Sequence, residues 1–301
     1  MVGKFIEKYF IVFLLIALAL GLYLPLFDKI PSQVLLVLLG TVIFFSSFQI
    51  TLSEIRAIRP SIVFIFYAAR FLILPAALYL FAMYLLPAYA AGIFLLALIP
   101  AGTASPGIAH IHRGNISLSL LIVIVSSLLA PLVLPFVLAV FTGRSVPIDV
   151  GELFLTLSVT IFLPVVLHLL FRRNRALLLR IREINSPVVV LLVCAMIMVI
   201  IGKQRSYIFE HLQVVPEYLF ISLATFLLFY VFGWAGSFRS DLSNRISFAI
   251  GSGVNNTALG IVISFLYFPT QVSTFLVISE IPWIIGIMLF QGYLNRQYSV
   301  S

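Results

Sequence analysis

Long apolar runs constrain this chain more than any other feature of its sequence. A helix that crosses a bilayer needs roughly 20 mostly apolar residues, and short polar stretches divide the 301 residues into ten such segments. Only 9% of the residues are charged, against about 25% in soluble proteins. The sequence therefore predicts an all-α, multi-pass membrane protein. Its ten helices are expected at Tyr9 to Phe27, Val34 to Thr51, Ser61 to Leu85, Ala90 to His112, Ile116 to Thr142, Gly151 to Phe171, Pro187 to Gly202, Tyr218 to Ser237, Ile246 to Phe268 and Val272 to Leu294.

Basic residues are distributed unequally between the two sides of the expected membrane. The side of the N-terminus holds Lys4, Lys8, Arg56, Arg59, Arg113, Arg172, Arg173, Arg175, Arg180, Arg182, Arg239, Arg245 and Arg296, and the other side holds Lys29, Arg144, Lys203 and Arg205. By the positive-inside rule both termini are cytoplasmic, and we expect a plasma (inner) membrane location. The net charge of +8 therefore reports topology and lipid contact, not nucleic-acid binding. The basic, amphipathic stretch 172–185 is expected to lie along the cytoplasmic interface.

The loop at 143–150 divides the ten segments into five and five. Because five is an odd number, a second copy of the first five helices must enter the membrane from the opposite face. The sequence thus predicts two inverted repeats, residues 1–142 and 151–301. Pro25 and Pro164 fall late in the first helix of each half, which supports this division.

Two of the apolar segments, the fourth in each half, are interrupted by small and polar residues. The first interruption is LIPAGTASPGI, Leu98 to Ile108, and the second is AIGSGVNNTALGI, Ala249 to Ile261. Lipid cannot satisfy the backbone groups that such a break frees, and paired interrupted helices indicate a transporter substrate site near the midplane. The alternative is that the small residues serve only close helix packing. The candidate substrate-binding residues in the two breaks are Gly102, Thr103, Ser105, Ser252, Gly253, Asn255, Asn256 and Thr257. Arg70 and Glu280 complete the set.

Two charged residues fall near the middle of apolar segments. Arg70 lies about ten residues, or roughly 14 Å, into the third, and Glu280 lies at a similar depth in the tenth. Charges at this depth face the protein interior and have partners. Arg70 is a fixed cation for an anionic substrate or in place of a coupling ion, or else half of a structural ion pair. We expect Arg70 and Glu280 to approach each other, directly or across the cavity.

Several motifs resemble the bile acid:sodium symporter family, part of a superfamily that includes arsenite and riboflavin transporters. The run from Pro100 to Pro135 resembles the family's fourth and fifth helices, GSGVNNTALGI its ninth-helix crossover, and AARFLILP, Ala68 to Pro75, its third helix. The resemblance implies ten helices, with discontinuous helices 4 and 9 crossing at the substrate site. It also implies a panel of helices 1, 2, 6 and 7 and a core of helices 3–5 and 8–10.

The sodium-binding positions that the resemblance implies are largely altered. Ser105, Ser119 and Asn255 keep polar side chains, whereas Pro106 and Val123 stand where the family has asparagine and threonine. Arg70 replaces a glutamine, and Gly251 replaces an acidic residue. A sodium ion about 4 Å from a guanidinium would be repelled by roughly 4 kcal/mol at an effective dielectric constant of 20. We therefore expect transport that is not coupled to sodium in the usual way of the family, with Arg70 replacing one coupling cation.

The function that follows is a secondary active transporter of a small or amphipathic organic anion, working by alternating access. One alternative is a sodium-dependent bile-acid-type symporter with altered ion sites, and another is a binding or sensor protein that no longer transports. We do not expect an enzyme, because Asp28, Asp149 and Asp241 all lie at segment boundaries or in loops. No resident cofactor or metal is expected, and sodium or a proton is the candidate coupling ion. The sequence leaves substrate identity, direction of transport and oligomeric state open.

Overall fold

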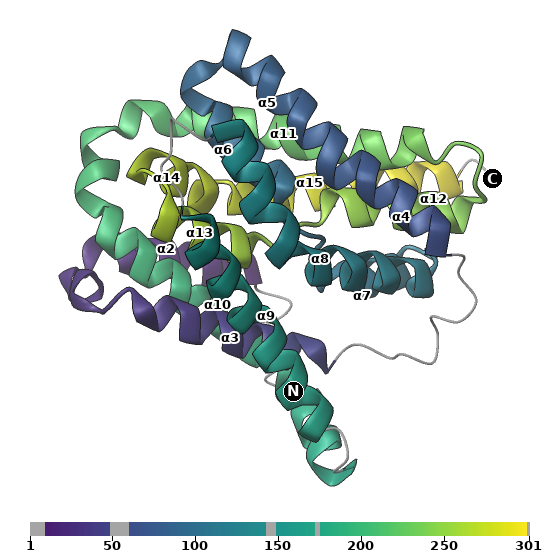
Figure 1. Ribbon diagram of the computed structural model, residues 1–301, viewed down its shortest axis with the longest axis horizontal. Helices are drawn as coiled ribbons and strands as arrows, with labels where there is room; N and C mark the ends of the chain where they lie inside the picture. Colours follow the sequence, from purple (N-terminus) through teal and green to yellow (C-terminus); the bar gives the residue numbers. More distant parts are fainter. Residues whose placement is uncertain (1–9, 49–59, 143–148, 172–174, 300–301) are drawn as a thin grey trace.

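The computed structural model describes residues 10–48, 60–142, 149–171 and 175–299, and across these ranges the chain is helical apart from short connections (Figure 1). The first half forms α2 (Phe10–Tyr23), η1 (Pro25–Lys29), α3 (Gln33–Ser47), α4 (Pro60–Ala68), η3 (Ala69–Ile73), α5 (Leu74–Leu85), η4 (Pro87–Tyr89), α6 (Ala90–Leu98), α7 (Ser105–Ile111) and α8 (Ile116–Thr142). The second half forms α9 (Val150–Phe171), α10 (Arg175–Glu210), η5 (Leu212–Val214), α11 (Val215–Gly236), α12 (Leu242–Gly253), α13 (Thr257–Tyr267), α14 (Thr270–Ile278) and α15 (Glu280–Ser299).

The lengths and composition of the helices fit a membrane protein. Six described helices are long and apolar enough to cross a bilayer, namely Ser61–Leu85, Ile116–Phe141, Val150–Phe171, Pro187–Glu210, Leu212–Gly236 and Thr270–Arg296. Shorter apolar helices lie at Val12–Tyr23, Gln33–Ser47, Pro87–Leu98 and Thr257–Tyr267. Large apolar side chains such as Ile65, Phe136 and Leu155 are exposed on the outside of the long helices, where lipid would cover them.

Some expectations concern residues that the structure does not describe. The loop expected at 143–150 falls outside the described ranges except for its last two residues, Asp149 and Val150. Seven of the basic residues that set the expected orientation also lie outside the described ranges, namely Lys4, Lys8, Arg56, Arg59, Arg144, Arg172 and Arg173.

The structure adds detail to two expected segments. From Arg175 on, the basic stretch 172–185 is the first part of α10, which runs without interruption from Arg175 to Glu210, and its position at the cytoplasmic interface stays a prediction. Its Arg, Ala, Leu and Ile residues favour a continuous helix. The tenth segment is one helical span, Thr270–Arg296, in which a turn at Ser279 separates α14, ending at Ile278, from α15, beginning at Glu280. Helical hydrogen bonds continue through this turn, because the Ser279 N–H group donates to the Phe275 carbonyl oxygen at 3.0 Å and the Trp283 N–H group donates to the Ser279 carbonyl oxygen at 2.9 Å. Pro282 lies just after the turn and has no N–H group to donate to the Ile278 carbonyl group.

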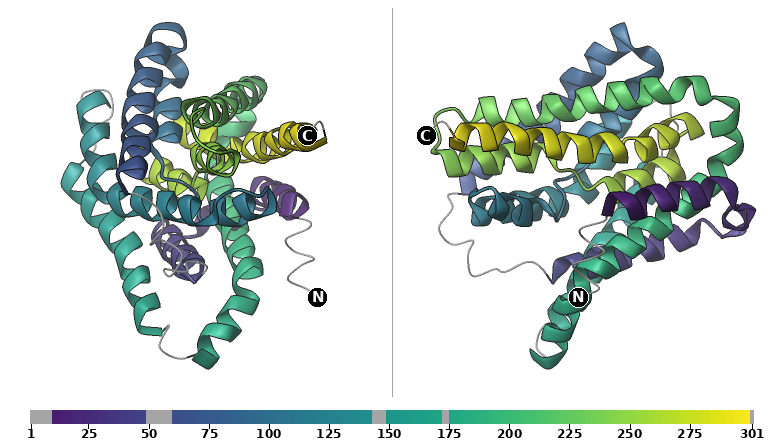
Figure 2. Two further views of the ribbon diagram at one scale, coloured as in Figure 1. Left: turned by 90° about the vertical axis from the view of Figure 1, so that its right-hand side faces the viewer. Right: turned by 180° about the vertical axis from the view of Figure 1, so that it is seen from behind.

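The helices pack in two groups. α10 packs along α2 and α3, and α3 packs along α9; we name these four helices the panel. α11 packs along α12 and α15, α5 packs along α6, and α7 packs along α8 (Figure 2); we name α4 to α8 and α11 to α15 the core. Glycine allows the close approach inside the panel, because a Cβ atom on Gly21 of α2 would lie 2.8 Å from the Met198 carbonyl oxygen of α10.

The two interrupted helices run in opposite directions through the molecule. In Figure 1, α7 and α12 lie toward the side of the C-terminus, and α6 and α13 lie toward the opposite side. The chain therefore passes from α6 to α7 in one direction and from α12 to α13 in the other. Both breaks meet in the interior of the molecule, where Ala101 pairs with Asn255.

Candidate functional site

The two breaks pair through their backbones. Ala101 and Asn255 form an isolated antiparallel bridge. The Gly102 N–H group donates to the Val254 carbonyl oxygen at 2.7 Å, and the Asn256 N–H group donates to the Pro100 carbonyl oxygen at 2.8 Å. Each break thus satisfies backbone groups that the other helix has freed, as a protein-enclosed break at membrane depth requires.

The sequence of the first break explains its geometry. Pro100 disfavours helical backbone at the preceding residue, and Ile99 is extended with φ −61° and ψ 140°. Gly102 permits the crossing, because a Cβ atom there would lie only 2.7 Å from the Asn255 carbonyl oxygen. α7 then starts at Ser105, with Pro106 in its first turn, where a missing N–H group costs nothing.

The second break depends on two adjacent asparagines. Asn256 caps α13, and its side-chain oxygen accepts a hydrogen bond from the Leu259 N–H group at 3.3 Å. The side chain of Asn255 turns the other way and donates to the Leu96 carbonyl oxygen of α6 at 2.7 Å. Asn255 therefore ties the second break to the last turn of the first broken helix.

The guanidinium group of Arg70 lies at the ends of both broken helices. Arg70 is fully buried. Its Nη1 donates to the Ala97 carbonyl oxygen at 2.8 Å, and its Nη2 donates to the Ser252 carbonyl oxygen at 2.8 Å. These two carbonyl groups belong to the last turns of α6 and α12, where helices leave acceptors without partners and carry partial negative charge. One fixed cation thus satisfies the C-terminal ends of two helices.

Further contacts fix the position of this guanidinium. Its Nε donates to the Ser252 hydroxyl at 2.9 Å, and its Nη2 donates to the Asn255 side-chain oxygen at 3.2 Å. The ring of Phe229 lies 3.9 Å from the guanidinium carbon, a favourable cation–π distance. Arg70 itself lies in the π-helical segment η3, a type of helix bulge found mostly at functional sites.

Arg70 and Glu280 do not form an ion pair. The hydrogen bonds of the Arg70 guanidinium end on Ala97, Ser252 and Asn255. Glu280 is 1% exposed, and its Oε1 atom has no hydrogen-bond partner among the described residues. The hydroxyl group of Thr257, at the start of α13, interacts with this carboxyl group. Direct pairing of the two charges is therefore wrong, because helix carbonyl groups take the place of the carboxylate. An approach of the two residues across the cavity stays a prediction.

A cavity of about 250 Å³ lies between the panel and the core. Its lining comes from α3, the first break, α7 and α8, and consists of Ser46, Thr103, Pro106, Gly107, His110, Ile116, Leu120 and Val123. Of the candidate substrate-binding residues only Thr103 is among them. Ser46 is a lining residue that the sequence interpretation missed, and the Ser46–Ser47 pair in an otherwise apolar run is the one signal that pointed to it.

The remaining candidates divide into two sets. Ser252 and Asn255 contact Arg70 at the crossing, and Gly102 pairs there with Val254. Ser105 and Thr257 begin the half-helices that follow the breaks. Gly253 packs against the ring of Tyr230 and so serves helix contact.

The positions implied for sodium do not form an open oxygen cage. The side-chain oxygen of Asn255 accepts from Arg70, and the Ser105 hydroxyl donates to the Val254 carbonyl oxygen at 3.4 Å. The Ser119 hydroxyl is buried without a hydrogen-bond partner among the described residues. A Cβ atom on Gly251 would lie 3.1 Å from the Ile122 side chain, so that an isoleucine fills the space of the missing acidic group. No cluster of three His, Cys, Asp or Glu side chains suited to a metal occurs in the described parts of the chain.

Comparison with known proteins agrees with this architecture. The model of the sodium bile acid symporter family matches residues 36–211, more than half of the chain. The chain is 23% identical over 276 residues to an uncharacterised sodium-dependent transporter, YocS, of Bacillus subtilis, covering 89% of this chain and 84% of that protein.

Plant proteins are similar as well. The probable sodium/metabolite cotransporter BASS1 of Arabidopsis thaliana, a chloroplast protein, is 24% identical over 274 residues, covering 89% of this chain and 68% of that protein. The BASS1 protein of Oryza sativa is 28% identical over 185 residues, covering 60% of this chain and 44% of that protein. The chain belongs to the sodium bile acid symporter family, a family of membrane transporters and not of enzymes.

Proposed function

We propose that this protein is a secondary active transporter of a small or amphipathic organic anion, and that it does not require sodium. The observation that supports sodium-independence is the Arg70 guanidinium on the carbonyl ends of α6 and α12. A guanidinium is always charged and cannot dissociate from the chain. It therefore supplies permanently the positive charge that a coupling cation would supply only while bound.

The energetics of a second cation favour the same proposal. A sodium ion about 4 Å from the guanidinium would lose roughly 4 kcal/mol of binding free energy at an effective dielectric constant of 20, about a thousandfold in affinity. The oxygen atoms that could offset this loss are engaged, since Ser252 and Asn255 both accept hydrogen bonds from Arg70.

We assign the cavity between panel and core to the substrate. Its volume of about 250 Å³ is close to the lower end of the usual range for ligand pockets, about 300 Å³. An anionic, amphipathic substrate is suggested by the description of the family and by the mixture of lining groups, in which His110 and Thr103 lie beside Leu120 and Val123. Arg70 is too deeply buried to contact this substrate, and it acts instead by holding the two breaks together.

Alternating access would follow from rocking of the core against the panel. In this structure the cavity lies at the α7 side of the crossing, which the positive-inside rule places toward the cytoplasm. On the opposite side buried hydrogen bonds join panel to core. The Gln204 side chain of α10 donates to the Ser273 hydroxyl, and the Thr274 hydroxyl of α14 donates to the Gln204 side-chain oxygen at 3.1 Å. The conformation would thus be open to one side and closed to the other.

A test combines binding with transport. Purified protein is screened by thermal shift against carboxylates, sulfates and bile acids, each with sodium or with choline, because a ligand of the folded state raises the apparent stability. Anions that raise it are then tested for uptake and counterflow in proteoliposomes. We expect uptake that is equal in sodium and in choline, and uptake that collapses in choline would contradict sodium-independence.

The alternative of a sodium-dependent symporter with altered ion sites is favoured by the names of the relatives. The buried, unpartnered Ser119 hydroxyl is the polar group that such a site could still use. Replacing Ser119 by alanine distinguishes the two, since it lowers sodium-dependent uptake only if sodium binds there. A binding protein that does not transport would show thermal shifts without counterflow.

A further inference from the structure

Glu280 carries a buried carboxyl group that has no role in the transport cycle proposed above. It is 1% exposed, and its Oε1 atom has no hydrogen-bond partner among the described residues. It also has no ion pair with Arg70, the one arginine of the described chain that is fully buried. A buried carboxylate without a cation is strongly disfavoured, and such a group takes up a proton instead. In the conformation seen here burial therefore favours the neutral carboxylic acid form of Glu280.

The titratable and polar groups around Glu280 leave it without a fixed counter-charge. α13 contributes the Thr257 hydroxyl, and α10 contributes Cys194, whose thiol interacts electrostatically with the carboxyl group. α11 and α14, which pack against α15, contain no Lys, Arg or His residue. None of these groups is a cation. The charge state of Glu280 thus depends on its access to water.

Burial and hydration favour opposite charge states of Glu280. Burial stabilises the protonated form, and water stabilises the ionised form once it reaches the carboxyl group. Both forms are therefore accessible to one residue as its exposure changes.

The position of Glu280 links its exposure to conformational change. Glu280 follows directly on α14, which packs against α10 of the panel, so it lies close to the boundary between the two groups of helices. Movement of the core against the panel would change the access of water to this boundary.

We propose that Glu280 is a proton-binding site of the transport cycle. The carboxylate takes one proton from water on one side of the membrane, crosses the occluded state as a neutral acid, and releases that proton on the other side. The role in transport rests on the proposed carrier function, and protonation of Glu280 itself does not.

The first test detects the proton directly and needs no substrate. Infrared difference spectroscopy of the full-length protein in lipid, during a pH titration, measures the C=O stretching band of a protonated carboxylic acid. We expect a reversible band that is absent in Glu280→Gln and unchanged in Glu210→Gln, an exposed control at the end of α10. Glu280→Asp keeps a carboxyl group and should shift the band, which covers the case in which Glu280→Gln does not fold. A band that persists in folded Glu280→Gln, or the absence of any such band in the native protein, would overturn the proposal.

The second test measures coupling with the anion that the thermal-shift screen identifies. In sodium-free proteoliposomes, a pH gradient should drive accumulation of this anion severalfold above its equilibrium level, and a protonophore should abolish the accumulation. Glu280→Gln should lose the accumulation but keep exchange at equal pH on both sides. If the native protein exchanges the anion but a pH gradient does not drive it, coupling through Glu280 is wrong. If no anion exchanges, the carrier function fails while the infrared result still decides whether Glu280 binds a proton.

Discussion

The charge of Arg70 is balanced by backbone dipoles and not by a carboxylate. Its partners are the Ala97 and Ser252 carbonyl groups at the ends of α6 and α12. A buried acceptor that loses its donor costs about 1–3 kcal/mol. Arg70 therefore stabilises the crossing of the two broken helices, whatever its role in transport.

Replacing Arg70 by glutamine should destabilise the protein by at least about 2 kcal/mol, because two carbonyl groups lose their donors. Arg70→Lys should be less severe, since the ammonium group keeps the charge but cannot reproduce the fork of donors. The measurement is the thermal midpoint in detergent, with the exposed Arg239→Gln as control. Equal midpoints for Arg70→Gln and Arg239→Gln would contradict the assignment.

Gly102 should tolerate no side chain. A Cβ atom there would lie 2.7 Å from the Asn255 carbonyl oxygen, so Gly102→Ala must push the two breaks apart. We expect a destabilisation of about 1–3 kcal/mol, typical of overpacking, and loss of the thermal shift with substrate anions. Gly107→Ala is the matched control for stability, because a Cβ atom at Gly107 meets nothing within 4 Å.

At the scale of elements, the sequence predicted the two breaks. Pro100, Gly102 and the pair Asn255–Asn256 stand out in apolar surroundings, and lipid leaves their backbone groups no other partner than each other. Proline alone would not have been enough to predict them. Prolines at 131, 135 and 164 do not break α8 or α9, and Pro282 lies within the continuous span Thr270–Arg296.

The partner of Arg70 could not be predicted from side-chain types. The sequence offered Glu280 as the one acidic residue at comparable depth, whereas the acceptors of the guanidinium are mainly backbone carbonyl groups, which every residue carries. Only the antiparallel pairing of the breaks decides which carbonyl groups come within reach of η3. A local pattern holds no information on such long-range geometry.

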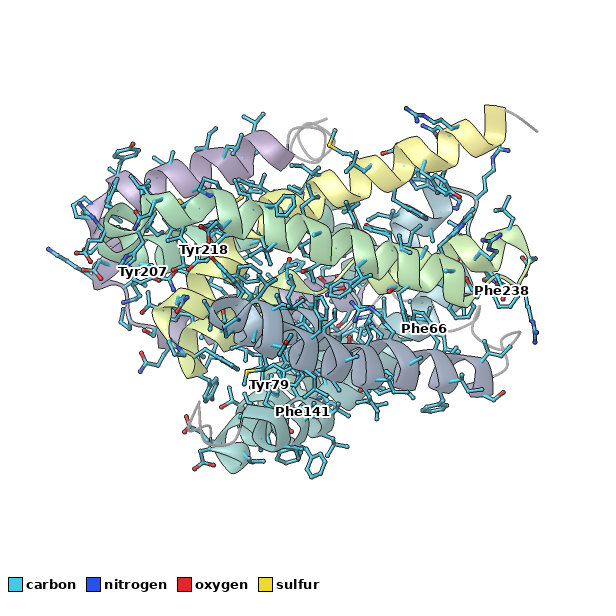
Figure 3. All side chains as sticks on the ribbon, turned by 90° about the horizontal axis from the view of Figure 1, so that it is seen from above. Phe66, Tyr79, Phe141, Tyr207, Tyr218 and Phe238 are labelled. Carbon is cyan, nitrogen blue, oxygen red and sulfur yellow. The ribbon has the colours of Figure 1, made fainter. Side chains whose placement is uncertain are left out.

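Closure of the molecule on the side opposite the cavity should depend on the contact between α10 and α14. Gln204 is 3% exposed and bonds to both Ser273 and Thr274. At the same end of the molecule, Figure 3 shows Tyr207 of α10 beside Tyr218 of α11. Panel and core are thus joined at this end through polar contacts.

Replacing Gln204 by leucine should favour opening on this side, because Ser273 and Thr274 lose their shared partner. Cys194 is the single cysteine of the chain and is 5% exposed on the same helix, which makes it a natural reporter. We expect severalfold faster maleimide labelling of Cys194 in Gln204→Leu than in the native protein. The exposed Gln213→Leu is the control, and equal labelling rates in all three proteins would show that the contact does not hold the boundary closed.

At the scale of the whole molecule, hydropathy and family resemblance account for the helical architecture. Outside the two breaks, the expected segments are mainly helical over their described parts. The contacts of α10 with α2 and α3, and of α3 with α9, support the panel that the resemblance implies, and the division into panel and core stays a proposal. Two inverted repeats of five helices remain our proposal, supported by the opposite directions of the two broken helices. Protease accessibility of tags at the two termini would test it, since both should lie on the same side of the membrane.

The residues that replace the sodium site lie on three helical elements, η3, α8 and α12. Restoring sodium binding should therefore require three substitutions. Arg70→Gln removes the fixed cation, Gly251→Glu supplies a negative charge, and Ile122→Ala clears the space that a Cβ atom at Gly251 would meet at 3.1 Å. We expect sodium to raise the thermal midpoint of the triple variant relative to choline, by about 1.4 kcal/mol of stability when sodium is at tenfold its Kd. The native protein and Arg70→Gln alone should show no difference between the two salts, because the single variant still lacks a formal negative charge at the site. A sodium-dependent shift in the native protein would mean that the guanidinium and the metal ion coexist, and that Arg70 has not replaced it.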